Sequence, residues 1–163
     1  MFASEPEPQP GCERSREAFE RAVEALSRKE RSAAELGAWL AERGFVPAEI
    51  EVAIGRLVAA GALDDERFAQ RFAEDKRELR GWGPERIREA LAGRGIDGEL
   101  IDAALAGERR DSQLERAIEL LERRAEAPAD EASRARALAF LARRGYDSEL
   151  AYDAVRLAER RAA

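Results

Sequence analysis

The chain has 163 residues, 45% of them hydrophobic and 38% charged, and carries a formal net charge of −6. It contains one cysteine and no histidine, so an intramolecular disulfide, a Cys/His zinc site and a histidine-assisted nucleophile are excluded. No signal segment is visible and no stretch approaches the roughly 20 apolar residues of a membrane helix, so we expect a cytoplasmic protein without membrane contact.

The composition predicts an all-α fold. Alanine, leucine, glutamate and arginine dominate, whereas threonine is absent, so the chain is rich in helix formers and poor in strand formers. Residues 1–14 differ, because prolines alternate with acidic residues there and such a segment cannot bury itself. We expect these residues to form a disordered tail.

Start and stop signals divide the first third of the chain into three helices. The first helix precedes Ser32, whose capping box with Glu35 starts the second helix. Gly44 closes that helix, and Pro47 opens the third, which Gly61 ends.

The same signals continue to the end of the chain. Six more helices are expected at about 64–80, 84–94, 97–106, 109–127, 130–144 and from 147 onward, which makes nine in all. Glycine or proline separates them, at Gly81, Gly83, Pro84, Gly95, Pro128 and Gly145.

The glycines that end helices recur at a nearly constant spacing. Three segments superpose with Gly44, Gly95 and Gly145 in register, 51 and 50 residues apart, and apolar residues recur at the same offsets from each glycine. The sequence therefore predicts three tandem three-helix repeats, at 15–61, 62–107 and 108–163, in an elongated array.

Apolar helical faces identify candidate core residues. The first helix of the first unit is expected to cover its core through Phe19 and Val23. Trp39, Phe140 and Tyr152 also lie on apolar faces, and we expect them in the core.

The acidic pair Asp64 and Asp65 allows two interpretations. Two neighbouring carboxylates could act as an acid/base pair or hold a magnesium ion, but both also stand where a helix begins and a negative charge stabilises the first turn. Arg67 and Arg71, one turn apart, could extend a binding face or only solvate the helix.

The segment 76–94 is basic within an acidic chain, with six basic and three acidic residues. Such residues often form a solvated face, but guanidinium groups also bind carboxylate and phosphate in forked geometry. Trp82, between two glycines, could pack into its own unit or stay available to a partner.

These residues carry a resemblance to a known family. The combination of LDDERFA at 63–69, Phe72, GWGPERIREAL at 81–91 and RGI at 94–96 resembles the RecX family of recombinase regulators. The resemblance covers about residues 15–160 and is strongest in the central unit. It agrees with the repeat period, since this family is built from tandem three-helix repeats.

Membership implies a non-enzymatic protein that binds the RecA filament on single-stranded DNA and restrains its growth. RecA-dependent ATP hydrolysis, strand exchange and LexA cleavage would fall as consequences. No cofactor or metal is implied. Because the chain is acidic overall, we expect direct DNA binding to be weak or absent, and we expect a monomer.

The resemblance and the basic segment together define the candidate site, which contains no catalytic residue. The residues expected to bind the partner are Asp64, Asp65, Arg67, Arg77, Arg80, Trp82, Arg86, Arg88 and Arg94. Those expected to hold the unit together are Phe68, Phe72, Gly81, Gly83, Pro84, Ile87, Leu91 and Gly95.

Three other functions compete with this one. The segment 33–65 reads like the helical half of a winged helix-turn-helix, which would indicate a DNA-binding transcription regulator, but no strand-like wing follows it. A helical scaffold for an unrelated protein is also compatible with the repeats. An enzyme has less support, because the phosphate-loop, dinucleotide and serine-esterase motifs are all missing.

Overall fold

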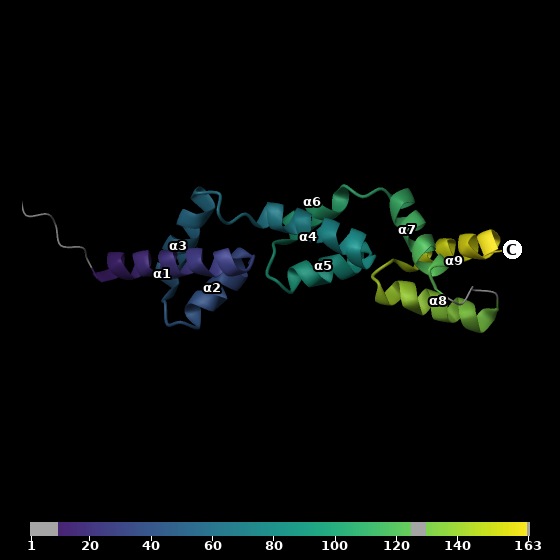
Figure 1. Cartoon of the computed structure of the whole chain (residues 1–163), viewed down its shortest axis with the longest axis horizontal. Helices are drawn as coiled ribbons and strands as arrows, with labels where there is room; N and C mark the ends of the chain where they lie inside the picture. Colours follow the sequence, from purple (N-terminus) through teal and green to yellow (C-terminus); the bar gives the residue numbers. More distant parts are fainter. Residues whose placement is uncertain (1–9, 125–129, 163) are drawn as a thin grey trace, which may run out of the picture. The chain divides into compact units, whose positions relative to one another are not determined.

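The computed structural model describes residues 10–124 and 130–162, and within these residues the chain forms nine α-helices and no strand (Figure 1). This confirms the all-α fold of three-helix repeats. The helices are α1 (Pro10–Arg28), α2 (Ala33–Ala41), α3 (Pro47–Ala59), α4 (Asp65–Arg80), α5 (Pro84–Ala92), α6 (Gly98–Ala106), α7 (Arg110–Glu122), α8 (Glu131–Arg143) and α9 (Ser148–Ala162).

The tertiary contacts divide the chain into two compact units. Unit 1 contains the first repeat up to Asp65 together with the short segment Arg94–Ile96. Unit 2 contains Glu66–Gly93 and the chain from Asp97 onward, so the other two repeats share one unit apart from that short segment.

The core of unit 1 lies among α1, α2 and α3, which contact one another (Figure 1). Leu36 and Leu40 of α2 and Leu57 of α3 are fully buried and form its centre. The α1 face that covers them is made of small side chains, Ala18, Ala22 and Ala25. The expectation that Val23 lies on this face is wrong, because it is 45% exposed, whereas Phe19 packs against the core from the side.

In unit 2 the central repeat buries Phe68 of α4 and Ile87 and Leu91 of α5. Phe72 is half-buried one turn after Phe68, and their rings stack with centroids 6.2 Å apart. The spacing of these residues is helical, so one face of each helix supplies the apolar contacts.

The last repeat has its own core, built from α7, α8 and α9. Ile118, Leu141 and Leu150 are its largest fully buried side chains. Phe140 packs partly buried against this core, as expected, but Tyr152 is 64% exposed. The prediction for Tyr152 is wrong because the buried stripe of α9 runs through Ala151, Ala154, Val155 and Ala158 instead.

Two helix boundaries differ from the prediction. Helix α1 already begins at Pro10, so residues 10–14 of the expected tail are helical, and residues 1–9 lie outside the described part of the chain. A proline suits a helix start because the first helical N–H has no partner within the helix. Helix α7 ends at Glu122, directly after the buried residue Leu121, and residues 125–127 of the expected helix lie outside the described part of the chain.

The start of α2 is held by a turn from further along the chain. Ser32 caps the helix, and Glu35 completes a capping box by accepting from the Ser32 N–H at 3.1 Å. Arg94 also forms a bidentate hydrogen bond with Glu35: the Arg94 Nε and Nη2 atoms each lie 2.8 Å from a carboxylate oxygen of Glu35. The Ser32 hydroxyl donates to the Arg94 carbonyl at 2.6 Å. One carboxylate therefore both caps α2 and anchors the 94–96 segment within unit 1.

We expect Glu35→Gln to lower the free energy of unfolding at pH 7 by about 1–2 kcal/mol, because the variant loses the charge-assisted bonds to Arg94. The hydrogen bonds from Arg94 hold the pKa of Glu35 below its usual value of 4.5. This stabilisation is therefore present above that value and is lost as the pH falls through the lowered pKa. Denaturant unfolding at pH 7 and pH 3 should show the gap between wild type and variant narrowing at the lower pH. The matched control is Glu42→Gln, at an exposed position after the same helix, which should unfold like wild type at both pH values.

Candidate partner-binding site

The candidate site is built around the break between α4 and α5 in unit 2. Gly81 adopts a left-handed backbone with φ +60° after the last residue of α4, and Gly83 caps α5 with an extended backbone. Both glycines are buried. Pro84 then occupies the first turn of α5, where no N–H is needed.

The turn 144–146 of the last repeat is seated against this break. The Gly83 N–H donates to the Arg144 carbonyl at 2.7 Å, and the Glu85 N–H donates to the Gly145 carbonyl at 3.1 Å. A Cβ on Gly83 would lie 2.4 Å from the Gly145 oxygen, and a Cβ on Gly145 would lie 2.3 Å from the Arg86 nitrogen. Glycine at 83 and 145 is therefore a condition for the two repeats to meet.

Side chains close the same junction. The Tyr146 hydroxyl donates to the Gly81 carbonyl at 3.3 Å, and its burial raises the pKa of the phenol. The Arg144 guanidinium donates to the Arg80 carbonyl, and that of Arg86 donates to the Arg143 carbonyl at 2.8 Å. These bonds satisfy carbonyls at helix ends that have no partner within their helices.

A buried ion cluster lies beside the junction. Glu108, whose side chain is only 5% exposed, pairs with Arg116 and with the Arg77 Nε at 3.1 Å. The contact between Arg77 Nε and Glu108 is an ion pair without hydrogen-bond geometry. The Nη2 atom of Arg77 donates to the Ala104 carbonyl at 3.0 Å. The Arg77 side chain is 14% exposed. Its position is that of a structural group, because removing one partner of a buried pair strands the other charge.

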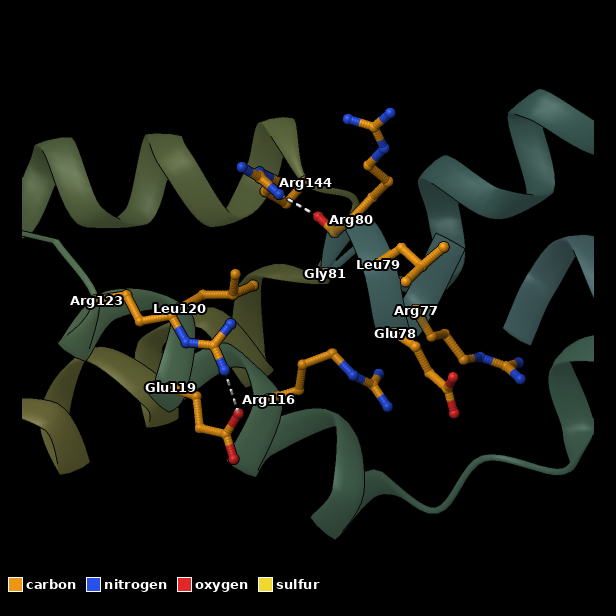
Figure 2. A pocket seen from close by; sticks show the side chains of 10 residues that line it. All are labelled: Arg77, Glu78, Leu79, Arg80, Gly81, Arg116, Glu119, Leu120, Arg123 and Arg144. Carbon is orange, nitrogen blue, oxygen red and sulfur yellow. Dashed lines mark hydrogen bonds and ion pairs between the residues drawn. The ribbon is translucent and has the colours of Figure 1, made fainter. Parts of the chain in front are cut away.

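Next to this cluster is a cavity of about 490 Å³, which we call the arginine pocket (Figure 2). It is lined by Arg77, Glu78, Leu79, Arg80, Gly81, Arg116, Glu119, Leu120, Arg123 and Arg144. Arg123 pairs with Glu119 at 3.2 Å, so its charge is partly compensated. Arg80 differs, because its backbone carbonyl accepts from Arg144 while its side chain extends outward (Figure 2). Leu79 beside it is 76% exposed.

The structure places other predicted partner-binding residues in contacts of their own. Trp82 is half-buried, with its ring at an edge-on angle to Phe72 (centroids 6.5 Å apart) and with the Arg86 guanidinium 4.4 Å from its centroid. Arg88 pairs with Asp102 at 2.6 Å. Partner binding by Trp82, Arg86 and Arg88 stays a prediction.

Three further predicted residues lie in or beside unit 1. Arg94 binds Glu35, and the Asp65 carboxylate accepts from the Ala33 N–H at 2.9 Å, so Asp65 satisfies the start of α2. Asp64 is exposed. Among the residues that the structure describes, no group of three or more Asp, Glu or Cys side chains is placed to hold a metal ion. Arg67, on α4 in unit 2, is exposed and stays a predicted contact.

Sequence reasoning missed the half of the pocket that comes from the last repeat. Arg116, Leu120 and Arg123 come from α7 and Arg144 from the turn before α9. A signal existed only for Arg144, which precedes the repeat glycine as Arg94 does. Arg116 and Arg123 stand in a helix rich in both charges, where the sequence does not distinguish pocket residues from a solvated face.

The fold and the comparisons with known proteins identify the class of protein to which the chain belongs. The chain is a tandem array of three-helix domains, and three domain models of one family match it in order: the first three-helix domain of RecX at residues 18–57, the second at 64–105 and the third at 111–155. Proteins named Regulatory protein RecX are similar to it. One from Xanthomonas campestris pv. campestris is 38% identical over 143 residues, covering 86% of this chain and 85% of that protein. One from Thermus thermophilus is 38% identical over 143 residues, covering 88% of this chain and 93% of that protein.

Solved structures agree in fold. The crystal structure of RecX from Lactobacillus salivarius superposes with a TM-score of 0.82 at 17% identity, covering 90% of this chain and 97% of that one. A crystal structure of a regulatory protein RecX superposes with a TM-score of 0.78 at 23% identity, covering 90% and 73%. The chain belongs to the RecX family.

We expect Gly83→Ala to destabilise unit 2 by about 2 kcal/mol or more, because the new methyl group would overlap the Gly145 carbonyl. Thermal unfolding measures this effect. Gly98→Ala is the matched control, because Gly98 is the first residue of α6 and its Cβ position has no neighbour from another part of the described chain within 4 Å. Equal melting temperatures for the two variants would contradict the close packing of Gly83.

Proposed function

We propose that this protein is a non-enzymatic regulator that binds the RecA filament on single-stranded DNA and restrains its growth. RecA-dependent ATP hydrolysis, strand exchange and LexA cleavage fall when growth is restrained. The observation that carries the proposal is the family match in all three repeats, together with the similarity to regulatory proteins over most of the chain. The proposed partner places this activity in the cytoplasm.

The arginine pocket supports a protein partner. Its wall pairs an exposed apolar side chain, Leu79, with the outward guanidinium of Arg80, and protein interfaces are enriched in arginine beside apolar contacts. Carboxylates are the natural complement, because a guanidinium binds them in forked geometry. We propose that an acidic surface of RecA contacts this pocket, and that exposed Arg67 extends the contact along α4.

The alternative of a helix-turn-helix transcription regulator gains no support from the fold. No observation favours a helix-turn-helix transcription regulator, and the described residues contain no strand that could form a wing. No helix among the described residues is long and apolar enough to cross a membrane.

The first test follows ATP hydrolysis by the cognate RecA on single-stranded DNA while this protein is added at substoichiometric ratios. We expect inhibition when the protein is added before filament assembly, and weaker inhibition when it is added afterwards, because growth is the step restrained. The protein alone should hydrolyse no ATP. Unchanged RecA hydrolysis in both orders would contradict the proposed function.

A second test addresses the arginine pocket. We expect the double variant Leu79→Ser, Arg80→Glu to require at least fivefold more protein for the same inhibition, because both side chains face outward and neither supports the fold. Arg77 is unsuitable for charge reversal, since it pairs with buried Glu108. The control is Arg16→Glu, an exposed position on α1, which should inhibit like wild type. Inhibition by a folded double variant at the wild-type level would remove the pocket from the mechanism and leave the function standing.

A third test separates RecA binding from DNA binding. We expect fluorescence anisotropy with a labelled single-stranded oligonucleotide to show no submicromolar affinity at physiological salt, because the chain is net negative and many of its arginines are already paired. Submicromolar affinity for DNA alone would overturn the proposal that contact with RecA dominates.

A further inference from the structure

Three turns of the chain share one sequence pattern. Each has an arginine, a glycine with positive φ, and a large apolar residue or tyrosine, at 43–45, 94–96 and 144–146. In the first and third, the backbone bonds are the same: the residue after the glycine donates to the carbonyl five residues earlier, from Phe45 to Leu40 and from Tyr146 to Leu141. This is the bonding of a Schellman helix end. We call the three segments arginine-glycine turns.

Two of these turns hold the beginning of a helix. In unit 1, the carbonyl of Arg94 accepts from the Ser32 hydroxyl, and the Gly95 Cβ position lies 2.5 Å from the Ala34 Cβ. In unit 2, the carbonyl of Arg144 accepts from the Gly83 N–H, and Gly145 touches the first turn of α5. In both, the arginine carbonyl takes a donor from the capping residue and the glycine permits close approach.

The turn at 43–45 has the same backbone bonding, but no helix start of the described residues contacts it. Among the described residues, no atom beyond Gly44 and its two chain neighbours lies within 4 Å of the Gly44 Cβ position, whereas Gly95 and Gly145 lie against another helix. Among the described residues, the structure contains no hydrogen bond to the Arg43 carbonyl. The Gly44 carbonyl accepts from Arg14 at 3.0 Å.

A cavity of about 320 Å³ lies at this empty turn. It is lined by Arg14, Glu17, Arg21, Arg43 and Phe45. Arg14 pairs with Glu49 at 3.1 Å and Arg21 with Glu24 at 3.9 Å, whereas Arg43 has no ion pair with a carboxylate of the described residues. The Arg43 side chain lies back on its own helix, where it donates to the Trp39 carbonyl at 2.9 Å and lies 3.5 Å from the centroid of the Trp39 ring. The equivalent Arg94 reaches instead to the Glu35 carboxylate.

We propose that the 43–45 turn and its cavity bind the first turn of a helix in a partner protein, one that has a serine or threonine cap and a glutamate at the third helical position. The cap donates to the Arg43 carbonyl, as Ser32 does to that of Arg94. The glutamate pairs with the Arg43 guanidinium, as Glu35 does with that of Arg94. The Arg43 guanidinium contacts a carbonyl and an aromatic ring rather than a carboxylate, so a glutamate of the partner is its charge complement.

None of the helices in the described part of the chain supplies this helix start. The starts of α2 and α5 are already bound by the arginine-glycine turns at 94–96 and 144–146. Helix α8, the equivalent helix of the last repeat, has 13 residues where α2 and α5 have 9, and Asp130 and Ser133 form a closed capping box at its start. The occupant is therefore a helix of another protein rather than a second copy of this chain.

The test uses a peptide that copies the helix start seen on Arg94. The probe is a synthetic peptide of residues 29–42 with Ala38→Lys joined to Glu42 by a lactam, which stabilises a helix too short to form alone. It is titrated into the full-length ¹⁵N-labelled protein. We expect amide shifts centred on Arg43, Gly44 and Phe45 with a dissociation constant on the order of 1 mM. A peptide with Glu35→Gln should bind at least fivefold more weakly.

Matched variants decide the result. The protein variant Arg43→Ala should lose the peptide shifts, while Arg28→Ala, an exposed arginine elsewhere on unit 1, should keep them. Absent shifts up to several millimolar peptide, or equal affinity of the Glu35→Gln peptide, would overturn the proposal. Tighter binding of a single-stranded oligonucleotide at the same amides would overturn the proposal and indicate that the turn binds nucleic acid. Shifts of the same amides on concentrating the protein alone would also overturn it and indicate that the turn binds a second copy of this chain. None of these outcomes depends on RecA.

Discussion

The structure depends on one recurrent contact, in which an arginine-glycine turn is seated on the first turn of a helix in the preceding repeat. The contact demands a glycine with positive φ, because a left-handed backbone ends the helix and the missing Cβ lets another backbone approach. At α5 the turn also accepts hydrogen bonds from the Gly83 and Glu85 N–H groups, which have no partner within the helix. Helix starts and helix ends thus satisfy each other, and short helices that are marginal alone become ordered together.

Tertiary ion pairs explain why the basic segment 76–94 is less available to a partner than its composition indicates. Residues 76–94 hold six basic and three acidic residues, but acidic partners arrive from outside the segment. Glu108 pairs with Arg77, Asp102 with Arg88, and Glu35 with Arg94. A charge count along the sequence therefore overstates the free positive charge, because folding brings these carboxylates to the arginines.

What remains exposed is a small set of groups suited to a protein partner. Leu79 and the Arg80 side chain stand at the end of α4, beside a pocket whose other wall comes from the last repeat. The three-helix units supply rigid elements, and the junction between the last two repeats holds the pocket in place. Such a surface fits a regulator of the RecX family, whose proposed work is contact rather than chemistry.

The sequence by itself determined the helical class, the repeat period and most helix starts. These properties are local: glycine, proline and capping residues act within a few positions, and the apolar spacing gives each helix its buried face. They placed Gly44, Gly95 and Gly145 in register and Ile87 and Leu91 in the core.

Only the tertiary structure decided which side chains share a site. It buried the alanines of α1 instead of Val23, exposed Tyr152, and joined Arg77 to Glu108 and Arg80 to a pocket wall from α7. These outcomes depend on the rotation of each helix and on the meeting of residues distant in sequence, and no pattern within one repeat contains that information.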